Sequence, residues 1–179
     1  MGTRSEIYIR NSMGCVGLWK HWDGYPDYMV PMFKEFLKYA FKRWRAQNHW
    51  LTYPEDMAAL LIAWYDKVNV KELRKVSKDH PINVDIRPLF GVDGKKMICD
   101  AEYAWVIDLP EPITINNFMD VPDELTFRIR GYRLEDWNGL NPIEIDKVAR
   151  GEELDGPRCE KVVDEKVTFR LRRKAVALD

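Results

Sequence analysis

The stretch His21-Trp22-Asp23-Gly24-Tyr25-Pro26, called the hexapeptide below, separates two kinds of sequence pattern. An apolar run ends at Trp19 before it, and a long helical pattern follows it. Gly24 supplies backbone freedom for a sharp turn. Pro26 disfavours helical backbone at Tyr25, because the proline ring clashes with the residue before it. We therefore expect a strand-to-helix junction here and arrange the rest of the chain around it.

The hexapeptide also concentrates functional groups. If the chain stays extended through Asp23, alternation places His21 and Asp23 on one side and Trp22 on the other. A carboxylate beside an imidazole fixes its tautomer and stabilises its charged form, as acid–base catalysis requires. We predict a polar pocket in which Asp23 orients His21 and Tyr25 donates a hydrogen bond, with these three as candidate catalytic residues. The alternative is a structural turn in which Trp22 and Tyr25 fill the core.

A resemblance extends from these residues to the start of the chain. Thr3-Arg4-Ser5-Glu6-Ile7-Tyr8-Ile9 precedes a short hairpin and then the hexapeptide. This N-terminal quarter to third resembles a group of small uncharacterised proteins of phages, prophages and archaea, which open with Thr-Arg-Ser and carry a His-Trp-Asp-Gly-Tyr-Pro block. The resemblance implies an intracellular microbial or viral protein, in the host cytoplasm if viral. It brings no assigned activity, so no catalytic role is carried over from it.

Composition and charge set broad limits. The 179 residues fit one domain spanning 1–179, with 46% hydrophobic residues and a formal net charge of −1. Without a strong net charge, any nucleic-acid partner needs a local basic patch. Charged residues make up 32% of the chain and Gln47 is its one glutamine, which leans towards a thermophilic source. No apolar run is long enough to span a membrane, so we expect no membrane partner.

The cysteines argue against several classes of site. Cys15, Cys99 and Cys159 are odd in number and widely spaced, and they form no Cys-x-x-Cys pair. This pattern argues against a zinc ribbon, a thioredoxin motif and a disulfide framework, and it fits a reduced cytoplasm. His21 and Asp23 alone are too few for a metal, so no metal site is predicted. The chain also lacks a phosphate loop and a dinucleotide fingerprint, so no cofactor is identified.

Periodicity predicts an α+β fold. Alternating apolar residues predict strands at 6–10 and 15–19, which form an N-terminal hairpin, and further strands at 82–87, 103–109, 126–130 and 168–172. Helical spacing predicts helices over 31–47 and from residue 54 to about 67, joined by a short loop. Asn141 and Pro142 predict a small third helix, which Gly151 ends. We expect an antiparallel sheet, including the hairpin, packed against an antiparallel helix pair.

Basic residues form two arrays and flank the first strand. One array follows a helix face: Lys34, Lys38, Lys42 and Arg45. The other lies in Thr126-Phe127-Arg128-Ile129-Arg130 and its echo Thr168-Phe169-Arg170-Leu171-Arg172, where Arg128, Arg130, Arg170 and Arg172 share the polar side. Both arrays fit either phosphate contacts or solvated surfaces. Arg4 and Arg10 bracket the first strand and are candidate ligand or phosphate contacts.

Three classes of function follow. The first is a protein with a polar pocket at the hexapeptide, which binds a small polar ligand or performs acid–base catalysis. The second is a nucleic-acid-binding module that uses the basic helix and strand faces. The third is a protein of a virus or mobile element that binds a host protein, with the hexapeptide as a structural brace.

Overall fold

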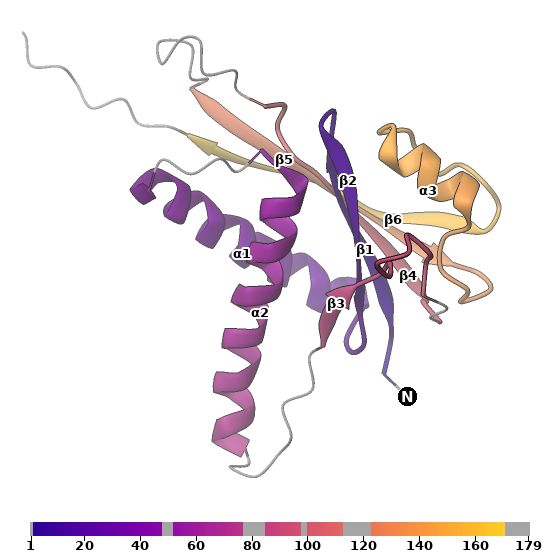
Figure 1. Ribbon diagram of the computed structural model, residues 1–179, viewed down its shortest axis with the longest axis horizontal. Helices are drawn as coiled ribbons and strands as arrows, with labels where there is room; N and C mark the ends of the chain where they lie inside the picture. Colours follow the sequence, from indigo (N-terminus) through magenta and orange to yellow (C-terminus); the bar gives the residue numbers. More distant parts are fainter. Residues whose placement is uncertain (1, 48–51, 77–84, 98–99, 113–122, 171–179) are drawn as a thin grey trace, which may run out of the picture.

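The computed structural model describes residues 2–47, 52–76, 85–97, 100–112 and 123–170. It contains a sheet with helices on both faces (Figure 1). The elements are, in order, β1 (Ser5–Asn11), β2 (Gly14–Lys20), α1 (Pro26–Gln47), α2 (Pro54–Val76), β3 (Ile86–Pro88), β4 (Tyr103–Asp108), β5 (Glu124–Leu134), α3 (Pro142–Ala149) and β6 (Cys159–Arg170).

The strand order is β3-β2-β1-β4-β5-β6. Strand β1 lies at the centre, antiparallel to β2 with Ile7 opposite Leu18 and parallel to β4 with Ile7 opposite Trp105. Every other neighbouring pair is antiparallel. The predicted α+β class, with an N-terminal hairpin in a mostly antiparallel sheet, is therefore confirmed, and β1–β4 is the parallel pair among the strands that the structure describes.

The two sheet faces carry separate cores because side chains alternate along each strand. Ile7, Ile9, Trp105 and Ile107 point to the face covered by α1 and α2. The opposite face is covered in part by α3 and buries a second set that includes Tyr8, Trp19, Ala104, Val106, Tyr132 and Leu140. Figure 1 shows α1 and α2 crossing over one face, with α3 on the other. Each central strand is thus buried on both sides.

Helix α1 begins earlier than the expected start at Pro31. It starts at Pro26, and the carbonyl of Tyr25 accepts the first-turn N–H of Met29 at 3.0 Å. Proline suits this first position because it needs no N–H there. Pro31 therefore lies inside the helix, where it removes only the bond to the carbonyl of Asp27. Burial of Met29 in the core favours the longer helix.

Other predicted elements agree in place but differ in length. Helix α2 continues to Val76, well past residue 67. Of the strand expected at 82–87, the described part forms β3, while residues 82–84 lie outside the described ranges. Helix α3 has the predicted Asn141 cap, completed as a capping box by Glu144, and Gly151 follows it with φ of 79°. These are the features that the local sequence specifies most directly.

The repeated segments pair with each other. Thr126 of β5 lies directly opposite Thr168 of β6, and their hydroxyl oxygens are 2.9 Å apart. Phe127 and Phe169 point to the α1 side, where the Phe169 ring stacks on Phe41 at 4.7 Å. The apolar residues therefore share one side, as predicted for the described residues, and Leu171 and Arg172 lie outside the described ranges.

Candidate functional site

The hexapeptide makes a tight junction against β1. Asp23 has φ of 54°, so the chain is not extended through this residue, and Gly24 donates its N–H to the carbonyl of Thr3 at 2.8 Å. The carbonyl of Gly24 accepts the indole N–H of Trp105 at 2.9 Å. A Cβ on Gly24 would lie 2.8 Å from the Cβ of Ser5. Gly24 is thus required for close approach to β1, while Asp23 takes the left-handed conformation.

A carboxylate from a segment distant in sequence binds the backbone of the hexapeptide. Asp85, which precedes β3, accepts the backbone N–H groups of His21 and Trp22 on Oδ1 at 3.0 and 2.9 Å. Its Oδ2 accepts Lys20 Nζ at 2.7 Å and the Tyr65 hydroxyl at 2.8 Å. With four donors, both oxygens of this buried carboxylate are fully used.

Lys20 is the cationic partner in this cluster. Its side chain is 0% exposed, and Nζ also donates to the carbonyl of Trp22. The ammonium lies 5.0 and 4.9 Å from the ring centres of Tyr28 and Tyr65, within cation–π range. Burial lowers the pKa of Lys20, and Asp85 partly opposes that effect. The Tyr28 and Tyr65 hydroxyls are 2.9 Å apart. The buried Lys20–Asp85 pair therefore lies where α1, α2, β2 and the start of β3 meet.

His21 lies on the outer side of the same junction and does not pair with Asp23. No hydrogen bond joins the two side chains among the described residues, and Asp23 instead acts electrostatically on Lys20 and Tyr28. Partial burial lowers the pKa of His21, as do Arg4, Arg87 and Lys20, whereas Asp85 raises it. A pKa below the ordinary value keeps the imidazole neutral near pH 7.

His21 belongs to a continuous row of three aromatic rings and one guanidinium. The guanidinium of Arg87 lies 4.3 Å above the Trp19 ring, Trp19 is 5.0 Å from His21, and His21 meets Trp22 edge-on at 4.2 Å. We call these four residues the ring row. Trp22 is 46% exposed at its outer end. The ring row lies at the edge of the sheet formed by β2 and β3, and it carries aromatic and cationic groups.

Several donors in the ring row have no protein acceptor within the described ranges. The Trp19 indole N–H is buried and makes no hydrogen bond there. The Arg87 guanidinium has no carboxylate partner in those ranges, and the ring nitrogens of His21 make no hydrogen bond to a described residue. Buried donors usually have acceptors. The row therefore presents unused hydrogen-bond donors from Trp19 and Arg87, and a neutral His21 adds one donor and one acceptor.

The other hexapeptide residues are placed differently from both interpretations of the sequence. Trp22 and Tyr25 are exposed, so neither fills the core. The Tyr25 ring contacts Tyr28 edge-on at 6.3 Å. A pocket that joins His21, Asp23 and Tyr25 side chains is not formed by any contact among the described residues, and their catalytic assignment stays a prediction.

The two candidate arginines lie at opposite ends of β1. Arg4 pairs with Asp100 at 2.6 Å and is close enough to His21 to lower its pKa. Arg10 pairs with Asp108 at 2.8 Å, beneath α3. Asp108 also binds both Nε and Nη2 of the fully buried Arg130 at 2.8 and 2.9 Å. Arg4 therefore adjoins the ring row, whereas Arg10 belongs to a buried network.

The basic arrays are largely neutralised by acidic neighbours. Arg128 binds Asp164 and Glu153, Arg170 binds Glu124 at 2.8 Å, and Lys34 pairs with Glu165 at 2.5 Å. These ion pairs leave the β5–β6 face without an excess of positive charge. Lys38 and Lys42 are exposed on α1, while the Arg45 side chain and Arg172 lie outside the described ranges.

Sequence reasoning missed the residues that support the site. Asp85 lies 62 positions beyond Asp23 in the numbering, and Tyr65 is part of a helical stripe that resembles ordinary core. Neither has a local signal, because only the sheet topology brings them together. Lys20 does have a local signal. It lies two residues after the inward-pointing Leu18, so alternation along the strand predicts that this lysine is buried.

The described residues form neither a metal-binding cluster nor a membrane-spanning helix. The described residues contain no group of three or more histidine, cysteine or acidic side chains arranged to hold a metal ion. None of the helices in the described ranges combines the length and apolarity that crossing a bilayer requires. Comparison with protein-family models, curated proteins and solved structures found no match to this chain.

Proposed function

We propose that this protein binds a small anionic ligand at the ring row, through a phosphate or carboxylate group. The observation that carries the proposal is the buried indole N–H of Trp19, which lacks an acceptor among the described residues and lies beside Arg87 and His21. A ligand that supplies oxygen acceptors accepts hydrogen bonds from the Arg87 guanidinium and from the one N–H of a neutral His21, and it reaches the buried Trp19 N–H only through a local shift of the row.

Each member of the row has a distinct part in this proposal. Arg87 is held over Trp19 and contributes a charged, planar donor that suits phosphate or carboxylate. His21 contributes a neutral ring that gains a proton more readily once an anion lies next to it. Trp22, exposed at the end of the row, offers a face for a planar group of the ligand. The site therefore favours a ligand that combines an anion with a ring.

The buried Lys20–Asp85 pair holds the backbone of this site in place. Asp85 binds the N–H groups of His21 and Trp22, so the positions of both rings depend on a charge pair that a ligand never contacts. Rigid support of this kind lowers the entropic cost of binding. A neutral His21 also suits a general base, which keeps acid–base catalysis on the bound ligand as a second proposal.

Titration with inorganic phosphate, citrate and AMP tests the proposal. In NMR spectra of the labelled chain, we expect AMP to shift the indole signals of Trp19 and Trp22 and to bind more tightly than phosphate alone. Arg87→Ala should weaken AMP binding about tenfold to a hundredfold, since a hydrogen bond to a charged group contributes about 1.5–3 kcal/mol. Arg150→Ala is the matched control, because that exposed arginine pairs with Glu152 at the end of α3.

The pH dependence gives an independent test of the role of His21. Binding should strengthen as the pH falls through the His21 pKa, because the protonated ring adds a positive charge beside the anion. The His21→Gln variant should lose that dependence and keep the remaining affinity. Absence of any shift at Trp19 with all three compounds, or equal affinity in Arg87→Ala, would contradict the proposal.

A further inference from the structure

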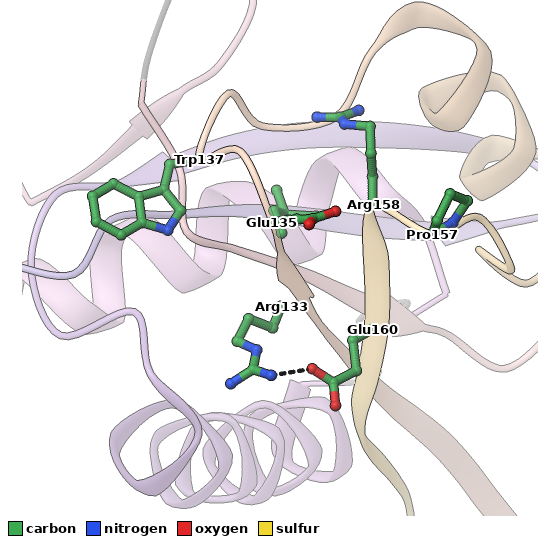
Figure 2. Close-up of a pocket in the computed structure, with 7 residues that line it drawn as sticks. Arg133, Glu135, Trp137, Pro157, Arg158 and Glu160 are labelled. Atoms are coloured by element: carbon green, nitrogen blue, oxygen red, sulfur yellow. Dashed lines mark hydrogen bonds and ion pairs between the residues drawn. The ribbon is translucent and has the colours of Figure 1, made fainter.

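A second site of different chemistry lies in a pocket beside the loop after β5. The pocket has a volume of about 410 Å³, a size that suits a small molecule. It is lined by Arg133, Leu134, Glu135, Trp137, Pro157, Arg158 and Glu160. Figure 2 shows Trp137 at one side and Pro157 at the other, with Glu135 between them and the Arg133–Glu160 pair below.

Trp137 is held outward at this pocket. It is 56% exposed and has φ of 57°, a left-handed conformation that costs about 1 kcal/mol or more for a residue with a side chain. The N–H of Ala101 binds the Trp137 carbonyl at 2.8 Å, and the Asp136 carboxylate accepts the N–H of Asn138. The backbone on both sides is thus fixed, and the indole is presented to solvent instead of to a core.

The cations that line the pocket are already neutralised. All three nitrogens of the Arg158 guanidinium donate hydrogen bonds, to Asp136, to Glu144 and to the carbonyl of Gly139. Arg158 lowers the pKa of Asp136 to about 2, so this pair stays charged at neutral pH. Arg133 is bound to Glu160.

Glu135 is the lining group without a partner. Its side chain is exposed and makes no hydrogen bond or ion pair with a described residue, although its backbone N–H binds the carbonyl of Arg158. One uncompensated carboxylate therefore lines the same pocket as an exposed indole. An indole face attracts cations through its quadrupole, and a carboxylate attracts them through its charge.

We propose that this pocket binds an organic ammonium cation, whose charge faces Glu135 and whose alkyl groups lie against Trp137. The chemistry is the opposite of that at the ring row, where the proposed ligand is an anion. The two sites lie at the same end of the sheet, because the loop after β5 and the hexapeptide after β2 both leave the sheet where β1 and β4 begin.

Choline and its neutral isostere 3,3-dimethyl-1-butanol test the charge requirement. The indole signal of Trp137 is identified in the labelled chain by the Trp137→Phe variant. We expect choline to shift this signal to saturation and the neutral alcohol to leave it unchanged at equal concentration. Equal shifts from both compounds would show that the pocket recognises only the alkyl groups and would overturn the proposal.

Variants separate Glu135 from the general surface charge. Glu135→Gln should weaken choline binding about twofold to fivefold, as expected for loss of a charge contact at an exposed site. The matched control, Glu124→Gln, removes a carboxylate at the other end of β5 and should bind choline like the parent chain. Unchanged affinity in Glu135→Gln would overturn the assignment of the cation to this carboxylate.

Two further titrations complete the test. N-acetyl-trimethyllysine amide carries the same cation on an amino-acid side chain, so tighter binding than choline assigns the natural source to a protein segment, and weaker binding assigns it to a small molecule. Inorganic phosphate should leave Trp137 unchanged, and a shift there would overturn the proposal. All readings are made at Trp137, so they are independent of signals from Trp19 and Trp22 in the ring row.

Discussion

Replacing Asp85 with asparagine tests whether the buried pair with Lys20 supports the junction. The change removes the charge opposite an ammonium whose side chain is 0% exposed, and it turns an amide NH₂ towards donors at 2.7 and 2.8 Å. Breaking a buried pair by removing one partner costs about 3–5 kcal/mol, because an uncompensated charge stays buried. We expect Asp85→Asn to lower the free energy of unfolding by that amount.

The assay is urea denaturation of the full chain, followed by circular dichroism and tryptophan fluorescence. Lys20→Met removes the other partner, and the double variant Lys20→Met/Asp85→Asn should be more stable than Asp85→Asn alone, since no charge is then left unpaired. The difference between the double variant and the sum of the single variants measures the coupling energy of the pair.

The pH dependence of the Asp85→Asn variant checks the cause. Burial lowers the pKa of Lys20, and loss of Asp85 removes the largest opposing influence. Between this lowered pKa and the value of about 10.4 in the unfolded chain, the unfolded state binds more protons, so stability should rise with pH. A loss below about 1 kcal/mol without this rise would show that Lys20 is not buried beside Asp85, because an exposed pair contributes about that little.

Four further outcomes follow from the structure. Gly24→Ala should cost about 1–3 kcal/mol in thermal or chemical denaturation, because the added Cβ would lie 2.8 Å from a β1 side chain. Asn141→Ala should cost about 1 kcal/mol through loss of the α3 cap, with intact strand signals in circular dichroism. Burial raises the pKa of Cys15 and of Cys159 to about 11, so both thiols should react slowly with iodoacetamide at pH 8 in the folded chain and rapidly in urea. Because the pKa of His21 is lowered, the unfolded chain takes up the proton first as the pH falls, and stability should decline below about pH 6.5; His21→Gln should remove that part of the decline.

Local patterns predicted the elements because local physics determines them. Alternation in β4 places Trp105 and Ile107 on one face, and the Asn141 cap fixes the start of α3. The start of α1 was misplaced because Pro31 is acceptable at a first position, while burial of Met29, which local sequence does not reveal, extends the helix to Pro26. Periodicity therefore predicts which segments are helical better than it predicts where they begin.

The position of the strand-to-helix junction was predicted, but its contacts were not. The hexapeptide does form the strand-to-helix junction, yet Asp23 turns the chain. The carboxylate that binds the N–H groups of His21 and Trp22 comes from Asp85. No spacing rule connects residues so far apart in sequence, because their contact depends on β3 pairing with β2. Arg87 joins Trp19 through the same pairing, which explains why the cationic end of the ring row was also missed.

The parallel pairing of β1 with β4 has a consequence for synthesis of the chain. β1 ends at Asn11 and β4 ends at Asp108, so the hairpin leaves the ribosome long before the strand that completes its inner edge. At about 5–20 residues per second, that edge waits roughly 5–20 s for its partner. At the start of this interval Ile7 and Ile9 belong to a two-stranded ribbon that is marginal by itself, and although α1, α2 and β3 emerge next, the β1 edge stays without β4 until the end. The N-terminal half should therefore depend on the second half to become protease-resistant, with protection arising in one late step after residue 108 has emerged.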